Sequence, residues 1–106
     1  MSKLPSHYLK FVEAYPEVGA AYRSLGEAAA TAGPLDKKTT ALIKLAMSMA
    51  SAQEGATHSH TRKALDAGAS PEEIRHAVIQ GVTTLGFPSM MRGLAWVEDV
   101  LNKTDS

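Results

Sequence analysis

The chain has 106 residues, with 11 basic and 11 acidic side chains and a formal net charge of zero. This length fits one domain, and the balanced charge excludes a one-signed field that would draw the chain to nucleic acid or to an anionic membrane. Cysteine is absent, which excludes disulfides, thiolate nucleophiles and cysteine-based zinc sites. Because no apolar run marks a signal peptide or a membrane span, we expect a cytoplasmic protein.

The first third of the chain has the periodicity of two helices. Apolar side chains first recur at i, i+3, i+4 and i+7, at Tyr8, Phe11, Val12 and Tyr15. After Pro16 a second stripe of the same kind follows, at Val18, Tyr22, Leu25 and Ala29. Gly33-Pro34 ends it, because proline cannot continue a helix and disfavours helical geometry in the residue before it.

Two further helices are predicted in the middle of the chain. Asp36 is a suitable N-cap for a helix that reaches about Gln53. Its apolar residues lie on almost every face, which indicates a helix that is central in the fold or covered by a partner chain. The next helix is expected from about Ala56 to Ala67, ending at Gly68.

Ser70-Pro71-Glu72-Glu73 is the sharpest local signal, because it combines an N-cap, a proline in the first helical position and a capping box. The helix that it starts is expected to end at Gly86. Pro88 opens another helix through Leu101, and the polar tail 102–106 is expected to fray. The fold class is therefore an all-α bundle of about six helices in a single domain, residues 1–106.

The segment 53–62 is the candidate functional centre, because polar residues interrupt apolar helix faces there. His60 shares a helix face with small alanine side chains, and His58 shares one with Glu54 and Arg62. Histidine is the side chain whose ordinary pKa suits proton transfer near neutral pH. Glu54 and His58 are four residues apart and could hydrogen-bond along the helix.

Structural interpretations of the same residues stay open. A histidine against an apolar face is more often a structural residue than a catalytic one, and Glu54-Gly55 could be only a helix junction. A metal site formed by Glu54, His58 and His60 has suitable ligand types. However, His58 and His60 diverge by about 200° on a regular helix and cannot chelate one ion. We therefore expect no metal and no cofactor.

Several segments resemble the carboxymuconolactone decarboxylase family, which includes the alkyl hydroperoxidase D-like proteins. The resemblance covers about 35–91, between N-terminal helices at 1–34 and a C-terminal helix and tail at 92–106. It is carried by Leu42-Ile43-Lys44-Leu45-Ala46-Met47, by Glu54-Gly55 with His60, by the run from Lys63 to Ile74, by Ala77-Val78-Ile79-Gln80 and by Gly86-Phe87-Pro88.

The resemblance implies an all-α fold and a symmetric homo-oligomer, a trimer or a hexamer. The family's redox branch carries Cys-x-x-Cys before the histidine, but Gln53 and Ala56 occupy those positions and Ala41 occupies that of a further glutamate. Thiol peroxidase activity is therefore not expected. The decarboxylase branch keeps the Glu-Gly pair and the histidine, as this chain does. The chain departs from that branch at Ala56, where an acidic residue is common, and in its shorter N-terminal region.

The resemblance implies a cofactor-free lyase that acts on a small carboxylated lactone or related acid from aromatic catabolism. His60 would be the general acid, Glu54 would orient or recharge it, and His58 could share the role. Arg62 or Arg92 would bind the substrate carboxylate. The alternative is a non-enzymatic oligomeric homologue that lost the redox pair and binds a small ligand or a partner protein. A third interpretation is an acid–base enzyme for another substrate.

Overall fold

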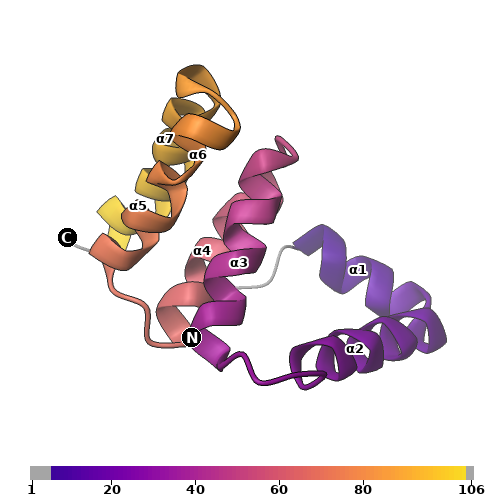
Figure 1. The fold of residues 1–106 in the computed structure, drawn as a ribbon. Coiled ribbons are helices and arrows are strands. Elements are labelled where there is room, and N and C mark those ends of the chain that lie inside the picture. The colour runs from indigo at the N-terminus through magenta and orange to yellow at the C-terminus, as the bar shows by residue number, and fades with distance from the viewer. Residues whose placement is uncertain (1–5, 105–106) are drawn as a thin grey trace.

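The computed structural model describes residues 6–104, and over this range the chain is entirely helical, with no strand (Figure 1). The all-α fold predicted from the sequence is thus confirmed. Seven helices follow one another: α1 (Ser6–Ala14), α2 (Pro16–Ala30), α3 (Lys37–Ala50), α4 (Glu54–Asp66), α5 (Pro71–Ile79), α6 (Gly81–Thr84) and α7 (Phe87–Thr104). None of the described helices combines the length and the apolar character that a bilayer crossing requires.

Helix starts follow the local capping signals. The Asp36 carboxylate accepts a hydrogen bond from the Thr39 backbone N–H at 2.7 Å, which begins α3. At α5 the Ser70 hydroxyl accepts from the Glu73 N–H at 3.1 Å, and the Glu73 carboxylate accepts from the Ser70 N–H at 2.9 Å. This reciprocal capping box satisfies two N–H groups that have no partner within the helix.

The structure differs from the sequence prediction at three boundaries. α4 begins at Glu54 rather than near Ala56, so the candidate carboxylate belongs to the helix. The single helix predicted from Ser70 to Gly86 is divided at Gln80 into α5 and the one-turn α6. α7 continues to Thr104, through most of the tail that was expected to fray, because the buried Val100 and Leu101 anchor its last turns. Residues 105–106 lie outside the described range.

The core lies where α3, α4, α5 and α7 meet. It is made of small and branched apolar side chains, and its fully buried members are Leu45, Met49, Ala64, Ile74, Val78, Val97 and Leu101. α3 packs most extensively on α4, and α7 packs on both α4 and α5. An ion pair adds to the α5–α7 contact, because the Arg75 guanidinium donates to both oxygens of Glu98 at 2.7 and 3.0 Å.

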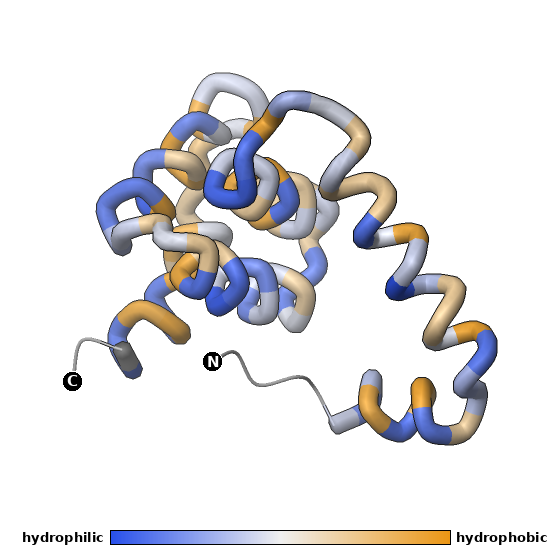
Figure 2. Tube along the Cα trace, turned by 90° about the horizontal axis from the view of Figure 1, so that it is seen from below, coloured by the Kyte–Doolittle hydropathy of each residue, from blue (hydrophilic) through white to orange (hydrophobic). Residues whose placement is uncertain are grey.

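The α1–α2 hairpin stands to one side of this bundle (Figures 1 and 2). The two helices pack on each other, with the rings of Phe11 and Tyr15 5.4 Å apart and Gly19 seated against Val12. α1 buries no residue and α2 buries only Gly19. Several large apolar side chains of the hairpin are therefore exposed: Leu9, Phe11, Tyr15, Val18, Tyr22 and Leu25.

Candidate functional site

The turn before α4 sets the orientation of the candidate site. Ala52 is the only described non-glycine residue with a positive φ, at 57°, a conformation that costs a residue with a Cβ about 1–2 kcal/mol. The turn closes through hydrogen bonds from the Ala52 N–H to the Met49 carbonyl and from the Gln53 N–H to the Ser48 carbonyl, at 3.0 and 3.1 Å. α4 therefore starts immediately after α3 and packs along it.

Buried threonines define the inner face of α4. Thr57 and Thr61 are fully buried, and their hydroxyls donate to backbone carbonyls one turn earlier, at 2.8 and 2.7 Å. The hydrogen-bonding capacity of both buried hydroxyls is thus satisfied by backbone carbonyls close to them in the chain. At 100° per residue, His58 and His60 lie on opposite flanks of this face. The two histidines therefore belong to two different sites.

His60 faces the gap between the hairpin and the bundle. His60 and Tyr22 together line three cavities of about 280, 290 and 490 Å³, which we call the His60 cleft. Ala56 lines the two smaller cavities, and Tyr8 lines the second and the largest. His60 is half-buried there, but its cleft is lined by Tyr22 and by two lysines as well as by the small side chains expected from the sequence.

Two lysines act on His60 by charge, and Arg23 and Glu27 of α2 also line the largest cavity. Lys44 from α3 lines two cavities of the cleft and Lys63 from α4 lines two. Burial lowers the pKa of His60 below its ordinary value, and Lys63 and Lys44 lower it further by charge repulsion. The part of the cleft beside Lys44 and Lys63 therefore suits an anion, which would relieve this repulsion.

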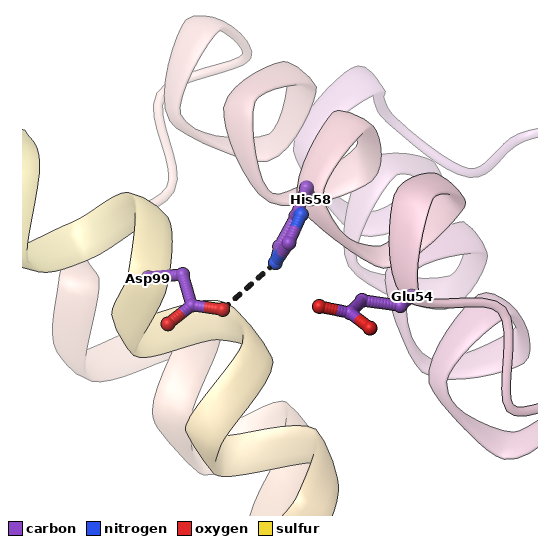
Figure 3. Close-up of side chains that lie close together, drawn as sticks. All are labelled: Glu54, His58 and Asp99. Atoms are coloured by element: carbon purple, nitrogen blue, oxygen red, sulfur yellow. Dashed lines mark hydrogen bonds and ion pairs between the residues drawn. The ribbon is translucent and has the colours of Figure 1, made fainter.

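His58 lies on the other flank of α4, beside α7. Its Nε2 is 2.9 Å from Oδ2 of Asp99, and Glu54 extends toward the same point one turn earlier on α4 (Figure 3). One donor atom from each of the three side chains lies within 4.8 Å of the others. The structure thus brings Glu54 and His58 together, as their spacing predicts. It adds Asp99, which the sequence did not indicate, as a third member of this cluster.

The other predicted site residues are elsewhere. The described residues that line the His60 cleft include neither Glu54 nor His58, and neither Arg62 nor Arg92. The Arg92 guanidinium lies over the ring of Trp96, 5.2 Å from its centre, an ordinary cation–π contact. Arg62 is partly buried, and its Nε has no hydrogen-bond partner in the described part of the chain.

Sequence reasoning missed Lys44, Lys63, Tyr22 and Asp99. Lys44 had a readable signal, because it is a lone charge in a helix that is apolar on almost every face. Lys63 lies three residues after His60, which is one helical turn. No local signal marks Asp99, which reaches His58 from 41 residues away.

These features define a thiol-free helical protein with a histidine at the wall of a cleft that two lysines also line. The chain belongs to the carboxymuconolactone decarboxylase family, whose model matches residues 16–99. A crystal structure of a candidate carboxymuconolactone decarboxylase from Burkholderia xenovorans LB400 has the same fold, with a TM-score of 0.74 at 20% identity over 96% of this chain and 83% of that one. The comparison with curated proteins found no match.

Proposed function

We propose that this protein is a cofactor-free carboxy-lyase that acts on a small carboxylated lactone, with His60 as the general acid. One observation carries the proposal: His60 is half-buried at the wall of a cleft that Lys44 and Lys63 also line. A carboxylated substrate needs a cation for its carboxylate and a proton donor beside it, and this cleft offers both. Family membership supports the reaction class.

The reaction would break the bond between the ring carbon and the carboxylate carbon. Lys44 and Lys63 hold the carboxylate, and the apolar parts of the cleft weaken its solvation, so that loss of the charge as CO2 is less opposed than in water. The electron pair of the broken bond stays on the ring carbon and delocalises into the lactone. His60 then donates its proton to that carbon, and solvent returns a proton to His60.

The lowered pKa of His60 fits a donor whose charged form a bound substrate would favour. In the free protein, burial and the two lysines disfavour the imidazolium form. A bound carboxylate would neutralise part of the lysine charge and raise the pKa of His60 again. Substrate binding would thus favour the protonated form of the acid in the complex, where it is needed.

A turnover assay with 4-carboxymuconolactone, following CO2 release, tests the proposal. We expect His60→Gln to lower kcat by about 10²-fold or more, which is the usual contribution of a positioned general acid. His76→Gln is the matched control, because His76 is an exposed histidine on α5. Lys44→Met tests the cleft lysine as the group that binds the carboxylate, and Arg92→Met tests the arginine predicted for that role from the sequence. The same assay with Glu54→Gln, His58→Gln and Arg62→Met tests the remaining predicted roles.

Two results would contradict the proposal. If wild type releases no CO2, this substrate is wrong, and the non-enzymatic binding protein becomes the better interpretation. If wild type turns over and His60→Gln does so equally well, His60 is a structural residue. A folded His60→Gln protein, shown by an unchanged circular dichroism spectrum, is required for either conclusion.

We also propose that the protein works in the cytoplasm as a homo-oligomer, a trimer or a hexamer. The exposed large apolar side chains of the hairpin support assembly, because such side chains, where they gather, are commonly covered by a partner. Cavities for small molecules often lie at such boundaries. The mass in solution, measured by light scattering, tests this proposal, and a purely monomeric mass would contradict it.

A further inference from the structure

The side chains of Glu54, His58 and Asp99 converge on one point between α4 and α7 (Figure 3). We propose that this group, which we call the α4–α7 triad, binds a divalent transition-metal ion of the Zn²⁺ type. The site is separate from the His60 cleft, because none of the three side chains lines that cleft. The proposal therefore does not depend on the lyase reaction.

The donor types select the class of ion. One imidazole nitrogen with two carboxylate oxygens is a set that Zn²⁺ and its first-row neighbours accept, whereas Mg²⁺ and Ca²⁺ prefer oxygen alone. Three protein ligands leave at least one coordination position for water. The two carboxylates also offset the charge of the ion, so that a dication could bind at this partly exposed surface with little net charge.

The geometry is close to that of a bound state. Ligand atoms about 2.0–2.2 Å from a metal lie about 3.0–3.6 Å from one another when they are adjacent. His58 Nε2 and Asp99 Oδ2 are already 2.9 Å apart, and the three donor atoms all lie within 4.8 Å of one another. Only the exposed Glu54 side chain needs a small rotation to complete the set. The metal would replace the contact between His58 Nε2 and Asp99 Oδ2.

The backbone holds the donors in position. Glu54 and His58 are four residues apart on α4, and so lie on the same side of the helix, a spacing that recurs in helical metal sites. Asp99 comes from α7, which packs directly on α4. Glu98, next to Asp99, is held by Arg75 through two hydrogen bonds, so this part of α7 is well anchored. A bound ion would link α4 to α7 directly.

Positive side chains near the triad limit the affinity. Arg62 lies one turn beyond His58 on α4, and Lys103 lies one turn beyond Asp99 on α7. Their charges oppose the binding of a metal cation, and solvent screens the exposed Lys103 more than the partly buried Arg62. We therefore expect a dissociation constant in the micromolar range for Zn²⁺ rather than the much tighter binding of closed structural sites.

Calorimetric titration of the metal-free full chain with ZnCl2 tests the inference. We expect one saturable site per chain, and a dissociation constant raised about tenfold or more by each of His58→Gln, Glu54→Gln and Asp99→Asn, since even outer-shell substitutions cost that much. His76→Gln and His60→Gln are the matched controls, because they remove other histidines and should leave binding unchanged. Zn²⁺ should also raise the Tm of wild type but not that of Asp99→Asn.

Three results would overturn the inference. The first is no saturable binding of Zn²⁺ below about 1 mM, an affinity no better than that of adventitious surface histidines. The second is a dissociation constant that Asp99→Asn and Glu54→Gln leave unchanged, which would show that His58 binds alone. The third is loss of binding in His60→Gln or His76→Gln with the triad intact, which would place the ion elsewhere.

Discussion

The α1–α2 hairpin and the α3–α7 bundle are built from helices with similar amphipathic patterns, yet they bury very different amounts of apolar surface. Leu45 in α3 is fully buried, whereas Leu25 in α2 is 67% exposed. The two parts show that a helical period specifies an apolar face but not what covers it. In the bundle the apolar faces of the helices pack against one another. In the hairpin they stay exposed, and the hairpin covers only the His60 cleft.

The largest expected difference between the two parts concerns leucine truncation. Leu45→Ala should lower the free energy of unfolding by about 2–5 kcal/mol, because it leaves a cavity in a closed core. Leu25→Ala should change the unfolding of the monomer by less than about 0.5 kcal/mol, because its side chain is already in water. Urea denaturation followed by circular dichroism measures both values.

The leucine pair also reports on assembly. If a second copy covers the hairpin, Leu25→Ala should weaken the oligomer in light scattering as the protein is diluted, while Leu45→Ala acts at every concentration. A loss of several kcal/mol in monomeric Leu25→Ala would contradict the comparison, because it would mean that the hairpin is closed within one chain.

A second contrast uses glycine. A Cβ at Gly93 in α7 would collide with Cγ of Met49 and lie 2.8 Å from its Sδ, so Gly93→Ala should destabilise by about 1–3 kcal/mol through overpacking. A Cβ at Gly26 in α2 would meet nothing within 4 Å. Gly26→Ala should therefore stabilise the protein by about 0.5–1 kcal/mol through helix propensity. Thermal unfolding compares the two, and equal effects would show that the hairpin packs as tightly as the bundle.

The smallest expected effect tests the hairpin as a cover for His60. NMR titration of the His60 ring should give a lowered pKa in wild type, and Tyr22→Ala should move that pKa back toward its ordinary value near 6.5 by opening the cleft to water. Tyr15→Ala is the matched control, because Tyr15 is about as exposed as Tyr22 but lies outside the three cavities. An unmoved pKa in Tyr22→Ala would show that Lys63 and Lys44 dominate instead.

The sign of the associated stability change follows from proton binding. Because the pKa of His60 is lower in the folded state, the unfolded state binds the proton more readily. Stability should therefore be highest above about pH 6.5 and fall as the pH drops through 6.5 toward the folded value. His60→Gln should remove this part of the pH dependence. The loss at lower pH caused by Glu98, whose pKa the hydrogen bond from Arg75 lowers, should remain.

Much of the fold could be predicted because its determinants are local. The caps at Asp36 and Ser70 and the helix ends at Gly68 and Gly86, which have φ values of 97° and 100°, depend on neighbouring residues. The break at Gln80 depends on packing instead, since the buried Gly81 that follows it brings α6 close to Met49. No sequence window includes that contact.

The candidate site likewise divides into features that depend on neighbouring residues and features that depend on packing. The helical period correctly separated His58 from His60, because two residues correspond to about 200° of rotation. It could not show that the hairpin reaches His60 through Tyr22, or that α7 brings Asp99 to His58. Arg62 and Arg92 were plausible by charge alone, whereas Lys44 and Lys63 face the cleft because of how α3 and α4 pack.

Because the turn at Ala52 is tight, the number of residues between α3 and α4 determines which way the side chains of both sites point. With the turn closed by two backbone hydrogen bonds, α4 inherits its rotation about its own axis from the end of α3. Each residue added or removed there would turn α4 by about 100°, carrying His60 out of the cleft and His58 away from Asp99 together. A change of length in this linker would therefore act as a double mutation on two distant surfaces, although no functional side chain is altered.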